Sequence, residues 1–271
     1  MTDAAVLRLE SATLWLGRRL LWDQLALAVP PGEFLAVLGP NGSGKTSLLR
    51  ALLGLQALTS GRVEVLGRAP RKGNPLVGYV PQQRAFDPDL ALRGRDLVAF
   101  GIDGHRWGWS FPSRTAAQQV DEMLRAVDAQ RYAGRPIGHL SGGEQQRLRV
   151  AQALIGGPRI LLCDEPLLSL DPNYQQSIVE LVSDWNRRRG ATVVFVTHDI
   201  NPVLHAVDRV LLLGGGRWAV GHPDEVLTQE TLSRVYGAQV DVLRTRGRVV
   251  VLGVDFGGHE PLPEIPHAVR Q

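Results

Sequence analysis

Apolar runs alternate with amphipathic stretches along most of the chain. Two stretches, residues 115–128 and 174–189, carry apolar side chains at helical spacing. Four short runs are mainly apolar, as strands buried on both faces of a sheet are: residues 33–38, 77–80, 159–163 and 192–197. Strands that alternate with helices in this way predict an α/β fold with a largely parallel central sheet.

The first thirty residues follow a different pattern. Residues 6–9, 13–16 and 25–29 predict three short strands separated by turns, which favours a small antiparallel sheet. After the buried strand that begins at residue 33, residues 47–53 predict a helix that ends at Gly54, because glycine is common just past a helix C-terminus.

The last third of the chain closes the predicted core. Residues 209–213 and 217–220 predict a hairpin that turns at the three glycines 214–216. Residues 241–271 are interpreted as a C-terminal extension. Its last part, residues 257–271, is rich in proline, glycine and histidine, and we expect it to end loosely.

Residues 86–157 predict a helical insertion in the α/β core. Residues 101–113 contain three glycines, a proline and two tryptophans, which predict an irregular loop. The helix predicted over residues 115–128 follows, with four apolar side chains on one face: Val120, Met123, Leu124 and Val127.

Length and composition suit one globular domain, which we expect over residues 5–240. The chain has 271 residues, of which 44% are hydrophobic and 21% charged. Its one cysteine, Cys163, excludes a disulfide framework within the chain and fits a reducing compartment. The first residues lack a signal-peptide pattern, and no apolar run approaches the ~20 residues of a spanning helix. We therefore expect that the chain does not cross a membrane by itself.

The charge pattern gives no sign of a nucleic-acid partner. The net charge is only +3, and the arginines are spread along the chain. The densest run, residues 187–189, lies at the expected end of a helix, where cations complement the helix dipole. Because a nucleic-acid surface needs a basic stripe, we expect none here.

Residues 39–46 read GPNGSGKT between a predicted strand and a predicted helix, which is the context of a phosphate-binding loop. Gly39, Gly42 and Gly44 allow backbone N–H groups to converge on phosphate oxygens, Lys45 supplies a cation, and Thr46 offers a hydroxyl to Mg²⁺. An ordinary glycine turn is the alternative, but the pattern arises by chance in only about one chain in a hundred of this length. The expected nucleotide contacts are Gly39, Pro40, Asn41, Gly42, Ser43, Gly44, Lys45, Thr46 and Ser47.

Residues 160–165 read ILLCDE, a buried strand that ends in two acids. Such a strand delivers its carboxylates to the sheet edge where α/β proteins bind ligands. We expect Asp164 to hold Mg²⁺ and Glu165 to act as the general base for an attacking water. An ordinary turn at the strand end is the alternative. Cys163 lies inside the strand, where packing is its expected role.

Two further polar residues follow predicted strands. His198 comes directly after the strand TVVFVT and could contact a γ-phosphate. Gln82 follows the run at residues 77–80 and could reach Mg²⁺ or the attacking water. Alone, each side chain would more often be structural, so their assignment depends on the phosphate loop and the acid pair.

Residues 140–144 read LSGGE, about 20 residues before the acidic strand. Ser141, Gly142 and Gly143 open a predicted helix whose free N–H groups can bind a phosphate. The alternative is a capping box, because Glu144 stands three residues after Ser141. The glycine pair favours the phosphate interpretation, since capping alone does not need it.

The order and spacing of these motifs resemble the ABC ATPase family from about residue 5 to residue 240, and LSGGE looks like its signature LSGGQ. The resemblance implies a P-loop NTPase (RecA-like) core with an N-terminal antiparallel β subdomain and an inserted α-helical subdomain. It also implies a nucleotide-dependent homodimer, in which Ser141, Gly142, Gly143 and Glu144 serve the ATP of the partner. Gln82 matches the Q-loop glutamine, His198 the switch histidine, and Asp171 the D-loop that crosses the interface.

Two positions depart from the family pattern. Glu144 replaces the glutamine of the signature, which should preserve backbone contacts to phosphate. The aromatic residue that stacks on adenine is usually placed just before the first hairpin's glycine, where this chain has Leu16 followed by Gly17. Either Trp15 takes this role, or adenine binding is weaker and less selective for the base.

Residues 197–241 resemble the ATPases of zinc and manganese importers. This implies an ATPase at the cytoplasmic face of the cell membrane that powers metal import through integral membrane permease subunits, served by an extracytoplasmic metal-binding protein. The alternatives are an iron-siderophore or cobalamin importer, a soluble ABC ATPase not tied to transport, and another P-loop enzyme such as a small-molecule kinase. The three histidines without tight ligand spacing are not expected to hold the metal: His222, His259 and His267.

Overall fold

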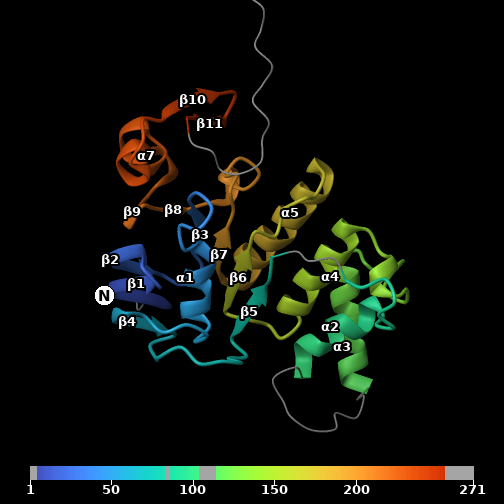
Figure 1. The fold of residues 1–271 in the computed structure, drawn as a ribbon. Coiled ribbons are helices and arrows are strands. Elements are labelled where there is room, and N and C mark those ends of the chain that lie inside the picture. Colours follow the sequence, from blue (N-terminus) through green and yellow to red (C-terminus); the bar gives the residue numbers. More distant parts are fainter. Residues whose placement is uncertain (1–4, 83–85, 104–113, 254–271) are drawn as a thin grey trace, which may run out of the picture.

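A six-stranded sheet forms the centre of the protein in the computed structural model, which describes residues 5–82, 86–103 and 114–253 (Figure 1). Its strands are β3 (Phe34–Leu38), β5 (Val77–Val80), β6 (Ile160–Asp164), β7 (Thr192–Val196), β8 (Arg209–Gly214) and β9 (Arg217–Gly221). They are ordered β5-β6-β7-β3-β8-β9, and only β9 runs antiparallel to its neighbour. The predicted α/β class, the four core strands and the hairpin are confirmed.

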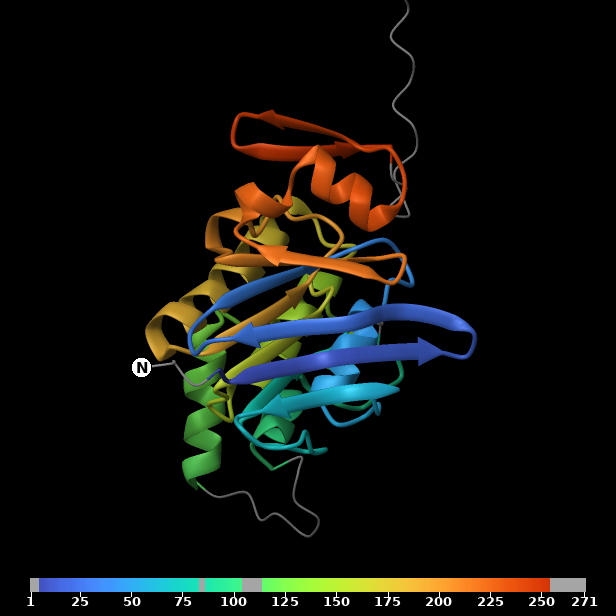
Figure 2. The same ribbon diagram turned by 90° about the vertical axis from the view of Figure 1, so that its left-hand side faces the viewer.

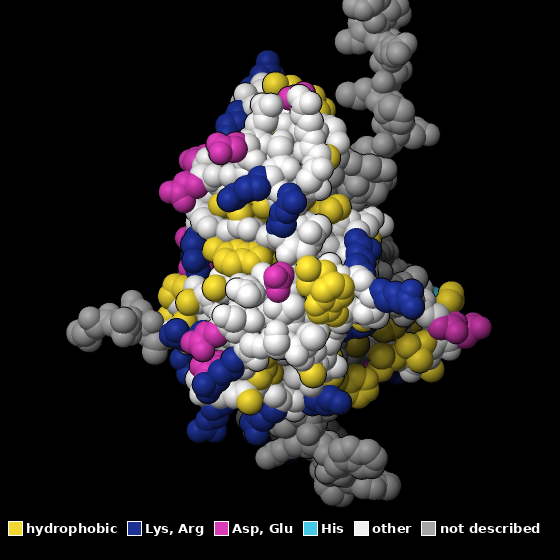
Figure 3. All heavy atoms as spheres, turned by 60° about the vertical axis from the view of Figure 1, so that its left-hand side comes forward, with side chains coloured by type: hydrophobic (Ala, Val, Ile, Leu, Met, Phe, Trp, Pro, Cys, Tyr) yellow, Lys and Arg dark blue, Asp and Glu magenta, His cyan; other side chains and the backbone are white. Residues whose placement is uncertain are grey.

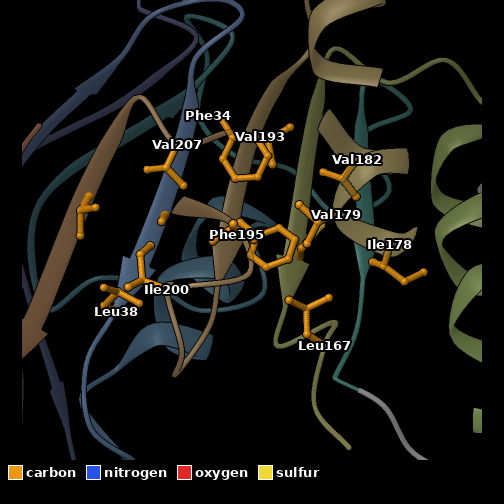
Figure 4. Close-up of a cluster of buried hydrophobic side chains, with 14 of the residues drawn as sticks. Phe34, Leu38, Leu167, Ile178, Val179, Val182, Val193, Phe195, Ile200 and Val207 are labelled. Atoms are coloured by element: carbon orange, nitrogen blue, oxygen red, sulfur yellow. The ribbon is translucent and has the colours of Figure 1, made fainter. Parts of the chain in front are cut away.

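Each face of this sheet is covered by its own hydrophobic core. The even-numbered residues of β3 belong to the core beneath α5 (Pro172–Arg189), and the odd-numbered residues pack in the core that includes α1 (Lys45–Leu52). Figure 4 shows the first core, where Phe34 and Phe195 of the sheet lie opposite Val179 of α5. Because both faces are buried, these strands need continuous apolar sequence, which is why they could be predicted.

Helix α5 begins and ends as its sequence indicates. Asp171 caps the helix, because its Oδ1 accepts hydrogen bonds from the N–H groups of Asn173 at 3.0 Å and Tyr174 at 3.2 Å. Gly190 ends the helix with a φ of 61°. The arginines at residues 187–189 lie in its last turn, as predicted, where they complement the negative end of the helix dipole.

An antiparallel sheet packs beside the central one (Figure 2) and contains β1 (Leu7–Leu16), β2 (Arg19–Val29) and β4 (Ser60–Val65) in the order β2-β1-β4. The predicted break between residues 9 and 13 is wrong. β1 is continuous, with a register shift against β2 between Leu9 and Ala12 and a positive φ of 45° at Ser11. β4 was not predicted, because SGRVEV is largely polar and its first three residues are exposed.

The helical insertion contains α2 (Gly94–Asp103), α3 (Arg114–Ala126) and α4 (Gly142–Leu154), which share a third hydrophobic core (Figure 1). The helix predicted at residues 115–128 is α3. The irregular loop predicted at residues 101–113 is wrong at its start, because residues 101–103 are the last turn of α2, while residues 104–113 lie outside the described chain. Gly101 indicates close helix packing, since a Cβ there would overlap the Gln152 carbonyl of α4.

The C-terminal extension carries a hairpin that the sequence pattern did not reveal, formed by β10 (Asp241–Thr245) and β11 (Arg248–Leu252) beyond α7 (Gln229–Tyr236). Asn201 holds it to the core, because its amide donates to the Val249 carbonyl at 2.9 Å and accepts from the Val249 N–H at 2.8 Å. The loose end predicted over residues 257–271 lies outside the described chain. The remaining short elements are η1 (Ile137–His139), η2 (Leu204–Ala206) and α6 (Pro223–Val226).

Cys163 is expected to resist alkylation in the folded protein. The residue is fully buried in β6, and burial raises the pKa of its thiol, so reaction requires the central sheet to open. With iodoacetamide at pH 8, mass spectrometry should show modification at least about 100-fold slower in buffer than in concentrated urea. Similar rates in the two solvents would contradict the buried position.

Candidate functional site

A cavity of about 420 Å³ opens at the carboxyl edge of the central sheet. It lies where β3 and β6 end, which is the edge where parallel sheets bind ligands. Twelve residues line it: Leu16, Leu21, Asn41, Gly42, Gly44, Lys45, Thr46, Ser47, Gln82, Glu165, Leu168 and His198. The fold therefore brings the predicted phosphate loop together with the predicted general base, glutamine and histidine.

The glycines of the loop have backbone angles that other residues rarely adopt. Gly39, Gly42 and Gly44 have φ values of 154°, 75° and 100°. A Cβ at Gly44 would also lie 2.5 Å from the Trp22 ring, and a Cβ at Gly39 would overlap the Leu213 carbonyl oxygen. The loop leads directly into α1. The N–H groups in the first turn of this helix have no partner within the helix, so they can donate hydrogen bonds to an anion.

Lys45 is held in place by the loop itself. Its Nζ donates to the Gly39 carbonyl at 2.7 Å and to the Pro40 carbonyl at 3.3 Å, and lies 3.8 Å from Glu165 Oε1. Only 6% of the side chain is exposed. Burial lowers the pKa of Lys45, and the nearby carboxylates of Glu165 and Asp164 oppose that shift. Lys45 therefore presents a nearly buried cation to the cavity, where it can meet an anion.

Asp164 lies behind the loop, next to Thr46. The Thr46 hydroxyl donates to Asp164 Oδ1 at 3.1 Å, and the Tyr79 hydroxyl donates to Oδ2 at 3.4 Å. Burial raises the pKa of Asp164, and the hydrogen bonds from Thr46 and Tyr79 and the charge of Lys45 oppose that shift. Oxygen ligands on a buried strand end fit a hard divalent cation such as Mg²⁺.

Tyr79 was not singled out from the sequence. It lies in β5 with its Cα paired to Leu162 of β6, two residues before Asp164, and burial raises its pKa to about 12. The sequence did contain a sign of its role, because the hydroxyl of a tyrosine in an otherwise apolar strand needs a hydrogen-bond partner. Only the pairing of β5 with β6 reveals that the partner is Asp164.

Glu165 faces the cavity from a strained backbone position. Its φ is 47°, and its N–H donates to the Val196 carbonyl at 3.1 Å, which fixes the turn after β6. Gln82 Nε2 lies 3.5 Å from Glu165 Oε2, and His198 lines the same cavity. The three predicted catalytic side chains therefore converge on one space, although their individual roles stay predictions.

Leu16 and Trp15 are placed differently. Leu16 lines the cavity and is 59% exposed, whereas Trp15 is 46% exposed and does not line it. Neighbouring strand residues point to opposite faces, which accounts for the difference. None of the described residues that line the cavity is Phe, Tyr or Trp.

The LSGGE segment lies outside this cavity, at the start of α4. The capping box is present: the Ser141 N–H donates to Glu144 Oε2 at 2.8 Å, and the Glu144 N–H donates to Ser141 Oγ at 3.3 Å. Packing also explains why residue 143 is a glycine, because a Cβ there would overlap the Tyr174 ring. Neither these residues nor Asp171 lines the cavity of their own chain.

The described residues hold neither a metal-binding cluster of side chains nor a membrane-spanning helix. Residues 5–82, 86–103 and 114–253 contain no group of three or more His, Cys, Asp or Glu placed to hold a metal ion. Among the helices in those ranges, none combines the length and apolar character that crossing a bilayer requires.

Known proteins show the same combination of sequence and fold. The profile of the ABC transporter family matches residues 22–168. The chain is 34% identical to the manganese transport system ATP-binding protein of Halalkalibacterium halodurans, covering 83% of this chain and 89% of the relative. It is 37% identical to the zinc transport system ATP-binding protein of Treponema pallidum, covering 81% and 82%. A phosphonates import ATP-binding protein of Maricaulis maris is 34% identical, covering 89% and 97%.

Solved structures agree with these relatives. An inward-facing metal-chelate type ABC transporter superposes with a TM-score of 0.77 at 28% identity, covering 91% of this chain and 96% of that chain. A dimeric ATP-binding cassette in a post-hydrolysis state with ADP and Pi superposes with a TM-score of 0.67 at 28% identity, covering 79% and 97%.

Proposed function

Because the chain belongs to the ABC transporter family of ATP-binding proteins, we propose that it hydrolyses ATP to power the import of a divalent metal ion, zinc or manganese. The observation that carries this proposal is that Lys45, Thr46 and Glu165 line the same cavity. The metal is inferred from the manganese and zinc transport relatives.

The loop and α1 bind the triphosphate of ATP. Lys45 exchanges its bonds to the loop carbonyls for phosphate oxygens, and the N–H groups at the start of α1 add hydrogen bonds and the positive end of the helix dipole. The remaining expected contacts belong to the same loop: Gly39, Pro40, Asn41, Gly42, Ser43, Gly44, Thr46 and Ser47. Leu16 is the hydrophobic contact for the base, since it borders the cavity.

Thr46, Asp164 and Gln82 are the residues that would hold Mg²⁺. Their oxygen atoms match the preference of this ion, and the Thr46–Asp164 hydrogen bond already brings two of them together. Bound Mg²⁺ would neutralise charge that develops on the phosphate oxygens.

Glu165 accepts a proton from the attacking water. Its carboxylate faces the cavity, and the fixed turn at its φ of 47° keeps it there. His198 contacts the γ-phosphate, and Gln82, close to Glu165, orients the water. This small set suffices because phosphoryl transfer depends mainly on positioning and on charge neutralisation.

A second copy of the chain completes each site. Ser141, Gly142, Gly143 and Glu144 lie away from the cavity of their own chain, at a helix N-terminus suited to an anion. They bind the ATP of the partner in a head-to-tail dimer, with Asp171 crossing the interface. ATP closes this dimer and hydrolysis reopens it, so each cycle can drive a permease between two states.

The subunit acts at the cytoplasmic face of the membrane with integral membrane permease subunits. The helical insertion contacts the permease, and an extracytoplasmic metal-binding protein delivers the ion.

Deletion of this chain tests the proposed cargo. Cells without it should lose high-affinity uptake of zinc or manganese, measured with radioactive tracer at submicromolar metal, and expression of the wild-type chain should restore it. Iron-siderophore, cobalamin and phosphonate uptake serve as parallel measurements. Loss of one of those activities with normal zinc and manganese uptake would overturn the metal assignment but leave the ATPase assignment intact.

A further inference from the structure

One arginine contacts the phosphate loop without belonging to any of the motifs. Arg19 is the first residue of β2, directly after the turn at Gly17 and Arg18, and its Cα is paired with that of Leu16. Its guanidinium lies against Gly42: Nη1, Cζ and Nη2 are 2.7, 3.2 and 3.3 Å from the position that a Cβ at Gly42 would take. The whole guanidinium group therefore lies on the loop backbone.

This cation is not neutralised within the described chain. No carboxylate forms an ion pair with Arg19 in residues 5–82, 86–103 and 114–253, although other arginines there, such as Arg209 and Arg244, have acidic partners. The side chain is exposed, so it can reorient at little cost. An unpaired arginine at the rim of an anion cradle raises the local potential for polyphosphate.

The part of the cavity next to Arg19, where Leu16 and Gly42 line it, lacks a surface for base recognition. Leu16, its partner across the hairpin, contributes an aliphatic side chain, and no described lining residue is Phe, Tyr or Trp. A leucine gives an adenine ring neither stacking nor hydrogen bonds that distinguish it from guanine. Affinity must then come mainly from the phosphates.

We propose that Arg19 is a further binding residue, which grips the polyphosphate from the outer side of the loop, so that the site recognises the triphosphate more than the base. The proposal rests on the nucleotide site described above. A guanidinium suits this task because its planar fork can donate two parallel hydrogen bonds to phosphate oxygens. Contact with Gly42, a glycine of the phosphate loop that lines the cavity, favours the phosphate over the base as its target.

Arg19→Ala and Arg18→Ala form a matched pair, because both residues are exposed arginines at the same hairpin turn and Arg19 supplies the three atoms nearest to the Cβ position at Gly42. Calorimetry with the full chain would compare ATP, GTP and inorganic tripolyphosphate. We expect Arg19→Ala to weaken all three by a similar factor of about fivefold to tenfold, and Arg18→Ala to change each by less than about twofold. The wild type should bind ATP and GTP within about tenfold of each other.

Each contrary result identifies its cause. If Arg19→Ala weakens ATP and leaves tripolyphosphate unchanged, Arg19 contacts the nucleoside and the proposal is overturned. Equal losses in the two variants would show a general charge effect, which also overturns it. The nucleotide site is checked separately by Lys45→Ala. If Lys45→Ala weakens ATP binding and Arg19→Ala does not, only the role of Arg19 is overturned. If Lys45→Ala leaves ATP binding unchanged, the assignment of the phosphate loop itself is overturned.

Discussion

Glu165→Gln is expected to lower ATP turnover by about 100-fold to 10,000-fold, the usual contribution of a general base. Glutamine has nearly the shape of glutamate, so the turn after β6 and the contact with Gln82 can persist, while the proton acceptor is lost. ATP binding should survive, because the phosphate loop and Lys45 are unchanged.

Phosphate release and light scattering would be measured on the same sample. The variant should accumulate as a dimer in MgATP, since each site can close but cannot complete hydrolysis. Glu180→Gln, an exposed glutamate on α5, is the control and should behave as wild type. Normal hydrolysis by Glu165→Gln would show that another group activates the water, and a monomer in MgATP with turnover blocked would contradict the shared site.

Lys45→Ala is expected to weaken ATP binding by about tenfold to a hundredfold, the range for a lost hydrogen bond between charged groups. Lys45 is buried and already directed at the loop carbonyls, so the wild-type side chain needs little reorganisation to meet phosphate. Loss of this prearranged cation leaves only N–H groups to balance the triphosphate.

Calorimetry with ATP and Mg²⁺ checks this prediction, together with circular dichroism to verify folding. Lys72→Ala is a suitable control, because Lys72 is the other lysine of the chain and is exposed. Unchanged affinity in Lys45→Ala would mean that the nucleotide is held elsewhere, and an equal loss in Lys72→Ala would indicate a nonspecific charge effect.

The strands and the phosphate loop could be predicted because their causes are local. A strand such as β3, buried on both faces, shows its burial as a continuous apolar run. The glycines at 39, 42 and 44 likewise show in the sequence that the backbone there takes unusual angles. Where the cause was not local, prediction failed: the polar edge strand β4 and the hairpin of β10 and β11 are stabilised by neighbours rather than by their own pattern.

Sequence by itself therefore determined the α/β class, the phosphate cradle and the acid pair at the end of β6, since each depends on residue types at short spacing. Tertiary structure alone decided that Tyr79 reaches Asp164, that Leu16 rather than Trp15 borders the cavity, and that Arg19 lies on Gly42. The physical reason is that these contacts arise where separate strands and loops meet. Their geometry follows from the packing of the whole sheet, which no short segment encodes.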